Sequence, residues 1–320
     1  MRPMWLLLFC GALAAQPVRL EKSIPLAGVK GRIDHFSVDV SGKRLFMAAL
    51  GNNTVEVLDP FAGTVLHTIR GLQEPQGVYY WPEGNRLYVA NGGNGKVQVF
   101  DGTTFAQMRE YDFNSDPDNI RFDAKQKEVF VGYGAGALGV ISAPIGSRVG
   151  ETPLDAHPES FQLEQNGPRV FINVPGVKRV TVIDRRTRSV TANWPLAEAQ
   201  QNFPMALDEA GHRLFVGCRK PAKLIVFDTE TGKQTASVDI AGDTDDLFYD
   251  RERKRIYVSG GAGSLTVLEE TGPDRYTQIA GIPTAPGART SLFVPEFKRL
   301  YVAVPHRGKQ AAELLVFSIE

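Results

Sequence analysis

The sequence has few of the residues that cross-link a protein. Only two of its 320 residues are cysteines, Cys10 and Cys218. Cys10 lies in an N-terminal segment that we expect to be removed, so Cys218 would have no partner for an intramolecular disulfide. Because Cys218 stands in the apolar stretch LFVGC, we expect a small buried hydrophobic residue rather than a reactive thiol. No disulfide framework is predicted.

The sequence also lacks an excess of either charge and any helical periodicity of useful length. Lys and Arg together number 36, as do Asp and Glu. This balance does not match the basic surface of a nucleic-acid-binding protein, although local patches remain open. Hydrophobic residues make up 42 % of the chain and charged residues 22 %, which is typical of globular proteins with a sizeable core.

The one marked hydrophobic run is near the N-terminus and has the features of a signal peptide. Arg2 precedes the run MWLLLFC at 4–10, and alanines at 12, 14 and 15 lead into polar Gln16. The run is too short to cross a bilayer as a helix, so residues 1–15 are predicted to be a cleaved signal peptide. The protein would then be exported to a periplasm, cell surface or extracellular space. A buried first strand and lipidation at Cys10 are weaker alternatives, because the segment does not fit the repeat described next and Phe9 is bulky.

Two short motifs recur seven times along the chain. The first is a strand-like tetrapeptide, at intervals of 41 to 44 residues: RLFM at 44–47, RLYV at 86–89, EVFV at 128–131, RVFI at 169–172, RLFV at 213–216, RIYV at 255–258 and RLYV at 299–302. The second follows each copy and ends at Asp59, Asp101, Ser142, Asp184, Asp228, Glu269 and Ser318. Seven copies of both motifs indicate a repeat architecture.

Each repeat reads as four short strands separated by turns rich in Gly, Asn, Asp and Pro. Such a unit of 40 to 45 residues is typical of a β-propeller blade. The last repeat ends after its third strand, while residues 18–26 (VRLEKSIPL) form an unassigned strand ahead of the first repeat. Pairing these two ends would close the ring and remove both free edges.

We therefore predict an all-β, seven-bladed propeller of four-stranded antiparallel blades, with the N-terminal strand completing the last blade. It would form a single domain over residues 16–320. The predicted blades are 31–72, 73–114, 115–155, 156–198, 199–242, 243–285, and 286–320 together with 18–26.

The segment LYVANGGNGKVQVFD at 87–101 closely resembles the YVTN-type repeat of bacterial and archaeal surface-layer and periplasmic propellers. LFMAALGNNTVEVLD at 45–59 and the turn in LIVFDTETGK at 224–233 support this resemblance, which covers about residues 30–318. The pattern is broken at Glu128, at Ser142 and in the long turn 305–313. The resemblance implies the propeller fold, but related propellers include lactone hydrolases, a streptogramin lyase, quinoproteins and pure binding proteins. It does not choose among these functions.

Aligning the repeats on the first residue of the tetrapeptide shows where a site would lie. Eight positions earlier the residues are mostly apolar, as packing between blades requires. Nine positions earlier stand His35, Gly77, Asn119, Ser160, Pro204, Asp246 and Thr290, and ten positions earlier stand Asp34, Gln76, Asp118, Glu159, Phe203, Asp245 and Arg289. Packing does not require such charged residues, so we predict a polar ring around the mouth of the central channel. The alternative is that they cap turns at the strand entries.

The predicted ligand-binding residues are drawn from these columns and from turns that open to the same face. They are Asp34, His35, Gln76, Asp118, Asn119, Glu159, Asp245, Asp246, Arg289, His306 and Arg307. Arg219 and Lys220 would add positive charge there, so an anionic small ligand is the natural expectation. The candidates for catalysis are His35 as general acid or base, Asp246 as its partner and Arg289 as an oxyanion holder.

A divalent cation is an alternative occupant of the mouth. Asp34, His35, Glu159 and Asp246 are the candidate ligands, and His157 is a further nitrogen donor. The spacing gives no support, since no HxxxH, CxxC or Asp-rich calcium loop occurs. The glycine-rich GGNG and GYGAG segments precede strands rather than helices, and no GxSxG motif is present.

These observations favour an envelope-associated binding module that holds a small molecule, with an anionic one expected, or an envelope protein. The alternatives are a hydrolase or lyase of lactone or ester-like substrates, using a His–carboxylate–Arg cluster, and a purely structural envelope protein. We expect a monomer that binds no nucleic acid and has no transmembrane segment after processing.

Overall fold

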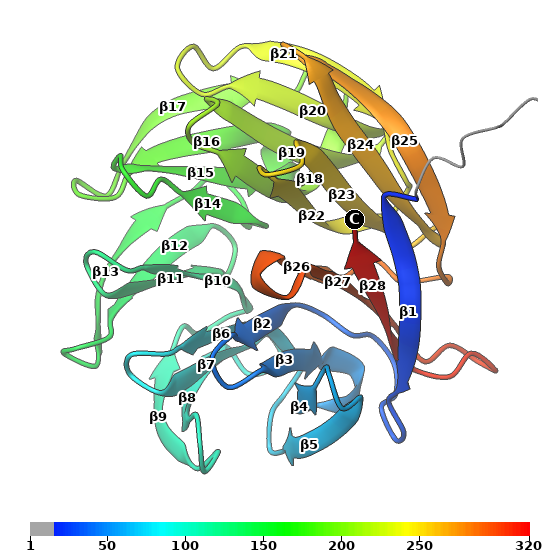
Figure 1. Ribbon diagram of the computed structural model, residues 1–320. Helices are drawn as coiled ribbons and strands as arrows, with labels where there is room; N and C mark the ends of the chain where they lie inside the picture. The colour runs from blue at the N-terminus through cyan, green and yellow to red at the C-terminus, as the bar shows by residue number, and fades with distance from the viewer. Residues whose placement is uncertain (1–15) are drawn as a thin grey trace, which may run out of the picture.

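The computed structural model describes residues 16–320, so the predicted signal peptide lies outside the described residues. Seven four-stranded antiparallel sheets are arranged radially around one axis (Figure 1). In this range there is no α-helix, only three 3₁₀ turns: η1 (Leu50–Asn52), η2 (Pro175–Val177) and η3 (Pro295–Phe297). Residues 16–320 also contain no helix long and apolar enough to cross a membrane. The chain is a seven-bladed β-propeller, as predicted.

Each of the first six blades is a meander of four consecutive strands. Blade one contains β2 (Phe36–Asp39), β3 (Arg44–Ala49), β4 (Thr54–Asp59) and β5 (Thr64–Ile69); blade two contains β6 (Pro75–Trp81), β7 (Arg86–Asn91), β8 (Lys96–Asp101) and β9 (Gln107–Asp112); blade three contains β10 (Pro117–Asp123), β11 (Glu128–Tyr133), β12 (Ala137–Ser142) and β13 (Ser147–Pro153).

The next three blades follow the same order from the axis outward. Blade four contains β14 (Phe161–Leu163), β15 (Arg169–Val174), β16 (Arg179–Asp184) and β17 (Ser189–Pro195); blade five contains β18 (Gln200–Asp208), β19 (Arg213–Lys220), β20 (Ala222–Asp228) and β21 (Gln234–Asp239); blade six contains β22 (Thr244–Asp250), β23 (Arg255–Gly260), β24 (Ser264–Gly272) and β25 (Arg275–Pro283).

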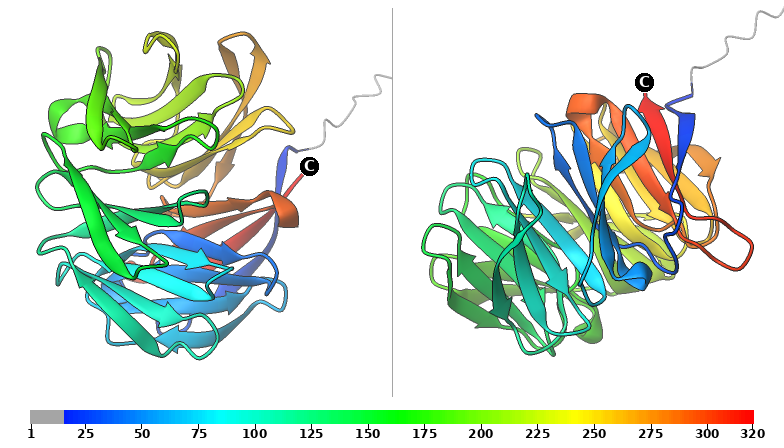
Figure 2. Two further views of the ribbon diagram at one scale, coloured as in Figure 1. Left: turned by 90° about the vertical axis from the view of Figure 1, so that its left-hand side faces the viewer. Right: turned by 90° about the horizontal axis from the view of Figure 1, so that it is seen from below.

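Blade seven closes the ring with strands from both ends of the chain. Its order is β26 (Ser291–Val294), β27 (Arg299–Val304), β28 (Glu313–Ile319) and, outermost, β1 (Val18–Pro25). β1 and β28 are antiparallel, with Val18 opposite Ile319 and Pro25 opposite Glu313. Both views of Figure 2 show the C-terminus beside this first strand. The predicted latch is confirmed, and the outer edge of β28 is paired with β1 rather than left open.

The two repeated motifs form the second and third strands of every blade. In β3 and β7 every residue after the first is buried, because both faces of the sheet pack against neighbouring blades. The outermost strands, such as β5 and β9, are largely exposed. The acid that ends the second motif closes the following turn: Asp228 Oδ1 accepts hydrogen bonds from the amides of Glu230 (3.1 Å) and Thr231 (2.8 Å). This explains why Asp recurs there.

In five of the blades the arginine that opens the first motif contacts the next blade. Arg44 donates to the carbonyl of Gly102 in blade two at 2.7 Å, and Arg86 donates to Ala143 in blade three at 3.2 Å. The corresponding arginines of blades four, five and six reach the next blade in the same way, through Arg169 to Thr229, Arg213 to Asp274 and Arg255 to Glu320. The recurrence of Arg is thus a property of blade packing rather than of strand formation.

At Glu128 the repeat has an acid instead, and the direction of this contact reverses. Arg185 and Arg188 of blade four reach back toward blade three. Arg185 Nε lies 2.8 Å from Asp123 Oδ2, and Arg188 Nη2 lies 3.7 Å from Glu128 Oε1. A charged contact between blades three and four is therefore kept at Glu128, but here the acid is in blade three and the arginine in blade four.

Candidate functional site

The leading ends of the seven innermost strands converge at one mouth of the channel. Eight positions before each motif, the residues that pack between the blades are all buried, as the alignment predicts: Phe36, Val78, Ile120, Phe161, Met205, Leu247 and Ser291. Above this apolar layer lies a cavity of about 240 Å³, which we call the mouth cavity. Every blade contributes to its lining: Arg32, Asp34, His35, Gln76, Asp116, Asp118, His157, Glu159, Phe203, Arg219, Asp245 and Arg289.

His35 lies among carboxylates from three blades. Its Nδ1 is 3.4 Å from Asp246 Oδ1, and its Nε2 is 3.6 Å from Asp34 Oδ1 and 4.0 Å from Asp118 Oδ1. Burial disfavours the charged imidazole, but Asp246 and Asp34 outweigh it and raise the pKa of His35 to about 10. The ring is therefore an imidazolium at neutral pH. It can donate protons in hydrogen bonds but cannot accept one as a general base.

Carboxyl groups around His35 respond to the same burial. Burial raises the pKa of Asp34 above its ordinary value, against the opposing charges of His35 and Arg32. Burial, together with Asp118 and Asp245, raises the pKa of Glu159 to about 8. Buried carboxyl groups that lie close together cannot all ionise, because like charges repel in a medium of low polarity. Some of them are therefore protonated near neutral pH and can donate a hydrogen bond.

His157 forms the blade-four wall of the mouth cavity. Its Nδ1 lies 2.6 Å from the carbonyl oxygen of Gly134, and its Nε2 lies 3.9 Å from Asp118 Oδ2. Burial opposes protonation, but Asp118 and the Gly134 carbonyl dominate and raise the pKa of His157 to about 9. Asp118 is buried between the two imidazoles, yet its Oδ1 accepts no hydrogen bond from the described residues.

Next to this wall, Arg219 crosses from blade five to blade six. Its Nη2 donates to Asp245 Oδ1 at 2.6 Å, its Nε donates to the carbonyl of Thr244 at 2.8 Å, and its guanidinium lies 3.6 Å from the centre of the Phe203 ring. Stacking on an aromatic face and bonding to a carboxylate fix this guanidinium in one orientation. Burial raises the pKa of Asp245 to about 7, although Arg219 opposes the shift.

Arg289 is held both by its backbone and by its side chain. Its carbonyl accepts hydrogen bonds from the amide of Asp246 at 3.2 Å and the hydroxyl of Ser259 at 2.6 Å. Its Nη1 donates to Asp243 Oδ1 at 2.9 Å, and its Nε is 3.9 Å from Asp245 Oδ2. Arg289 thus faces the blade-six carboxylates.

The structure brings most of the predicted residues to one place. Asp34, His35, Gln76, Asp118, Glu159, Asp245 and Arg289 line the mouth cavity. Asp246 lies beneath it, where Oδ1 contacts His35 and Oδ2 accepts a hydrogen bond from the amide of Ser291 at 2.8 Å. Asn119 is buried and does not line the cavity. His306 and Arg307 line a separate cavity beside it, and Lys220 lines neither.

Arg32, Asp116 and His157 line the mouth cavity although they lie outside the two columns of the predicted ring; of these only His157 was expected at the mouth, as a donor to a cation. All three stand twelve positions before the aligned motif, two residues ahead of the column that contains Asp34, Asp118 and Glu159. In an extended chain, alternate residues face the same side. The column twelve positions before the motif therefore also predicts residues that line the mouth.

The four candidate metal ligands are only partly brought together. Asp34, His35 and Asp246 are close to one another, with His35 Nε2 3.6 Å from Asp34 Oδ1 and His35 Nδ1 3.4 Å from Asp246 Oδ1. Within residues 16–320 there is no group of three His, Cys, Asp or Glu side chains arranged to hold an ion. The geometry gives the cation alternative no support.

Comparison with known proteins identifies the fold and nothing finer. No family model matches the chain, and no curated protein matches it. Among solved structures, a chain of hydrazine synthase from Kuenenia stuttgartiensis has a TM-score of 0.76 at 18 % identity, covering 86 % of this chain and 94 % of that one. A chain from a crystal structure of a mitotic checkpoint complex has a TM-score of 0.79 at 15 % identity, covering 99 % of both chains. At these identities the similarity shows a shared seven-bladed propeller.

Proposed function

We propose that this chain is an exported β-propeller that acts as a binding module and holds a small polar ligand in its mouth cavity. The propeller fold is a common scaffold for binding, and its ligand sites lie at the channel mouth. Export is supported by the arrangement of Arg2, the apolar run at 4–10 and the alanines before Gln16.

One observation carries the proposal: every blade directs a side chain into the same cavity, and most of these side chains are charged and withdrawn from water. Burial of ionisable groups destabilises a fold unless they are fully paired. Here the pairing is incomplete, since Asp118 Oδ1 has no hydrogen-bond donor among the described residues. Asp118 Oδ1 is itself fully buried, so a ligand with hydroxyl, amide or ammonium groups would donate instead to the carboxyl oxygens that line the cavity.

The charge state of His35 favours binding over the hydrolase or lyase alternative. A hydrolytic cluster of His35, Asp246 and Arg289 would need an imidazole that accepts a proton near neutral pH. With a pKa of about 10, His35 is already protonated. Arg289 is occupied by Asp243 rather than directed at an oxyanion position beside His35. The cluster therefore matches hydrogen-bond donation to a ligand better than general-base catalysis.

The experiment is a thermal-shift screen of the purified protein against polar metabolites, followed by calorimetric titration of any compound that stabilises it. A ligand that binds only the folded state raises the melting temperature by mass action. Asp118→Asn keeps the shape of the side chain but removes an acceptor, so affinity should fall about tenfold or more. Asp239→Asn, on an exposed outer strand, should leave affinity unchanged.

A compound that binds wild type, Asp118→Asn and Gln76→Ala with equal affinity would place its site elsewhere and contradict the proposal. Gln76→Ala is the second variant because Gln76 lies at the edge of the mouth cavity, bonded only to Asp116 at 2.8 Å, and can be removed without opening the His35 cluster. Export is tested separately by fusing residues 1–30 to a reporter that is active only outside the cytoplasm. Leu7→Arg should abolish reporter activity.

A further inference from the structure

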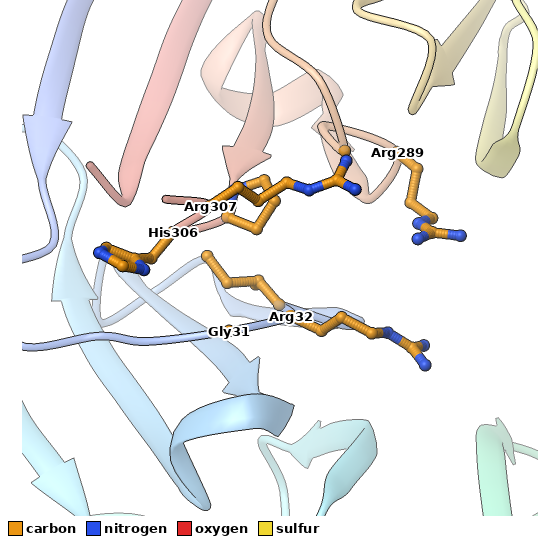
Figure 3. A pocket seen from close by; sticks show the side chains of 8 residues that line it. Gly31, Arg32, Arg289, His306 and Arg307 are labelled. Atoms are coloured by element: carbon orange, nitrogen blue, oxygen red, sulfur yellow. The ribbon is translucent and has the colours of Figure 1, made fainter. Parts of the chain in front are cut away.

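A second cavity lies beside the mouth cavity, between blades one and seven. Its volume is about 330 Å³, and it is lined by Gly31, Arg32, Ile33, Gly287, Arg289, Pro305, His306 and Arg307. We call it the basic cavity. Arg32 and Arg289 line both cavities, so the two spaces adjoin at these side chains. Figure 3 shows the guanidinium groups of Arg32, Arg289 and Arg307 on the same side of the basic cavity, with His306 at the other end.

The basic cavity contains three arginines and a histidine but no carboxylate. Its residues come from three separate segments: the chain before β2, the chain before β26 and the long β27–β28 turn. That turn is the place where the sequence departs from the repeat pattern. This turn is longer than the packing of the blade requires, and it places His306 and Arg307 in the lining of the basic cavity.

Charge compensation differs sharply between the two cavities. Each cation of the mouth cavity has a carboxylate within 4.0 Å: Arg32, His35, His157, Arg219 and Arg289 are all paired. Arg307 and His306 form no ion pair with any carboxylate of residues 16–320, and the Arg307 side chain makes no hydrogen bond to these residues. Arg307 therefore brings a positive charge without a carboxylate partner to the basic cavity.

The turn that presents Arg307 is held in place. Arg307 and Gln310 exchange backbone hydrogen bonds of 3.1 and 3.0 Å, and Gln310 Nε2 donates to the carbonyls of Pro286 (3.0 Å) and Pro305 (2.8 Å). Gly287 has a φ of +83°, and a Cβ there would lie 2.9 Å from Arg307 Nη1. The guanidinium thus packs directly over the backbone of blade seven. A positioned group loses less conformational freedom when a ligand binds.

We propose that the basic cavity binds an oxyanion, a carboxylate or phosphate group, of the same small ligand whose remainder occupies the mouth cavity. This inference rests on the proposed function. Guanidinium groups bind carboxylate and phosphate oxygens through paired N–H donors. Here the unpaired guanidinium of Arg307 lines the same cavity as Arg32 and Arg289, whose carboxylate partners are not part of the cavity lining. The volume suits part of a small molecule rather than a polymer chain. The ligand is therefore anionic at one end and rich in hydrogen-bond donors at the other.

The test uses inorganic phosphate and succinate as probes, titrated by calorimetry into the full-length protein at constant ionic strength maintained with sodium chloride. We expect saturable binding of at least one probe, and the stronger of the two identifies the preferred oxyanion. Arg307→Gln should weaken it about tenfold, the equivalent of one charge-assisted hydrogen bond. Lys309→Gln is the matched control, because Lys309 is an exposed cation of the same turn that does not line the basic cavity.

Two results would overturn the inference: no saturable binding of either probe, or equal losses from Arg307→Gln and Lys309→Gln, which would indicate general attraction by the turn. Arg307 is exposed, so the variant should fold, and an unchanged melting temperature without ligand verifies this. Failure here is distinct from failure of the proposed function. A screened ligand that is sensitive to Asp118→Asn but not to Arg307→Gln would keep the mouth site and refute the oxyanion site.

Discussion

Replacing Glu159 with glutamine should make the protein more stable at pH 8 and leave it almost unchanged at pH 5. Glu159 lines the mouth cavity, and burial raises its pKa from 4.5 to about 8, with Asp118 and Asp245 adding to the shift. Its proton is thus held more tightly in the folded than in the unfolded chain. Between pH 4.5 and 8 the unfolded state releases this proton first, so stability falls as the pH rises through that window.

The size of the effect follows from the shift. Each pKa unit corresponds to about 1.4 kcal/mol, which gives an upper limit of about 5 kcal/mol for a group moved from 4.5 to about 8. The Glu159 side chain is only partly buried, so we expect screening by solvent to leave roughly 2 kcal/mol. For a domain of this length that corresponds to roughly 4 °C in melting temperature.

The measurement is the melting temperature of wild type and Glu159→Gln by scanning calorimetry at pH 5, 6, 7 and 8. Only the difference between the two proteins is interpreted, because His35 and His157 titrate in both. Their raised pKa values stabilise the fold fully below pH 6.5, and this contribution is lost as the pH rises from 6.5 to about 9 for His157 and about 10 for His35. Glu296→Gln, an exposed glutamate in η3 without an ion pair in the described chain, is the control and should follow wild type. Parallel curves for wild type and Glu159→Gln would refute the electrostatic picture of the mouth.

Three further results are expected. Gly77→Ala should destabilise the protein by about 1–3 kcal/mol in urea titrations, because its Cβ would lie 2.0 Å from the carbonyl oxygen of Asp118; an unchanged midpoint would show that the backbones are not in contact. Cys218 is fully buried and burial raises its pKa to about 12, so thiol reagents should modify it only as fast as the chain unfolds, and rapid labelling of native protein would contradict this. Removing residues 16–26 should leave β28 as an open edge and give aggregation in size-exclusion chromatography, whereas a monomer that melts like wild type would mean that the latch is dispensable.

The fold could be predicted because its signals are local and are repeated seven times. Alternation with period two, turn residues at regular spacing and the unmatched ends of the chain are all readable without knowing any contact between blades. The role of the motif arginine was not readable in this way. Arg44 and Arg86 look like the first residues of strands, and only the packing of neighbouring blades reveals that each bonds to a carbonyl of the next. The reversed pairing at Glu128 is explained by the same contact.

Alignment of the repeats predicts which residues surround the mouth but not which of them contact one another. Alignment placed Asp34, Asp118 and Asp245 around one axis, which the structure shows. It did not predict that Arg289 donates a hydrogen bond to Asp243, nor that Arg307 lines the basic cavity instead of the mouth cavity. These outcomes depend on loops that differ in length and backbone angle between blades, and repeat spacing carries no information about such differences.

The distribution of variation among the seven repeats is itself an argument for function at the mouth. Eight positions before each motif the residue is buried in every blade, from Phe36 to Ser291. One to four positions further toward the mouth, the chain presents carboxylates, imidazoles, guanidinium groups and a phenyl ring in no repeating order. If these residues served only to cap turns, each blade would face the same local demand and Asp or Asn would suffice in all of them. Instead, residues that differ between blades form pairs around the axis, such as His35 of blade one with Asp246 of blade six. Such pairs can form only when the ring is closed. The seven blades share the same arrangement of strands and buried positions, which makes the ring rigid, and they differ at the mouth, where a ligand would bind.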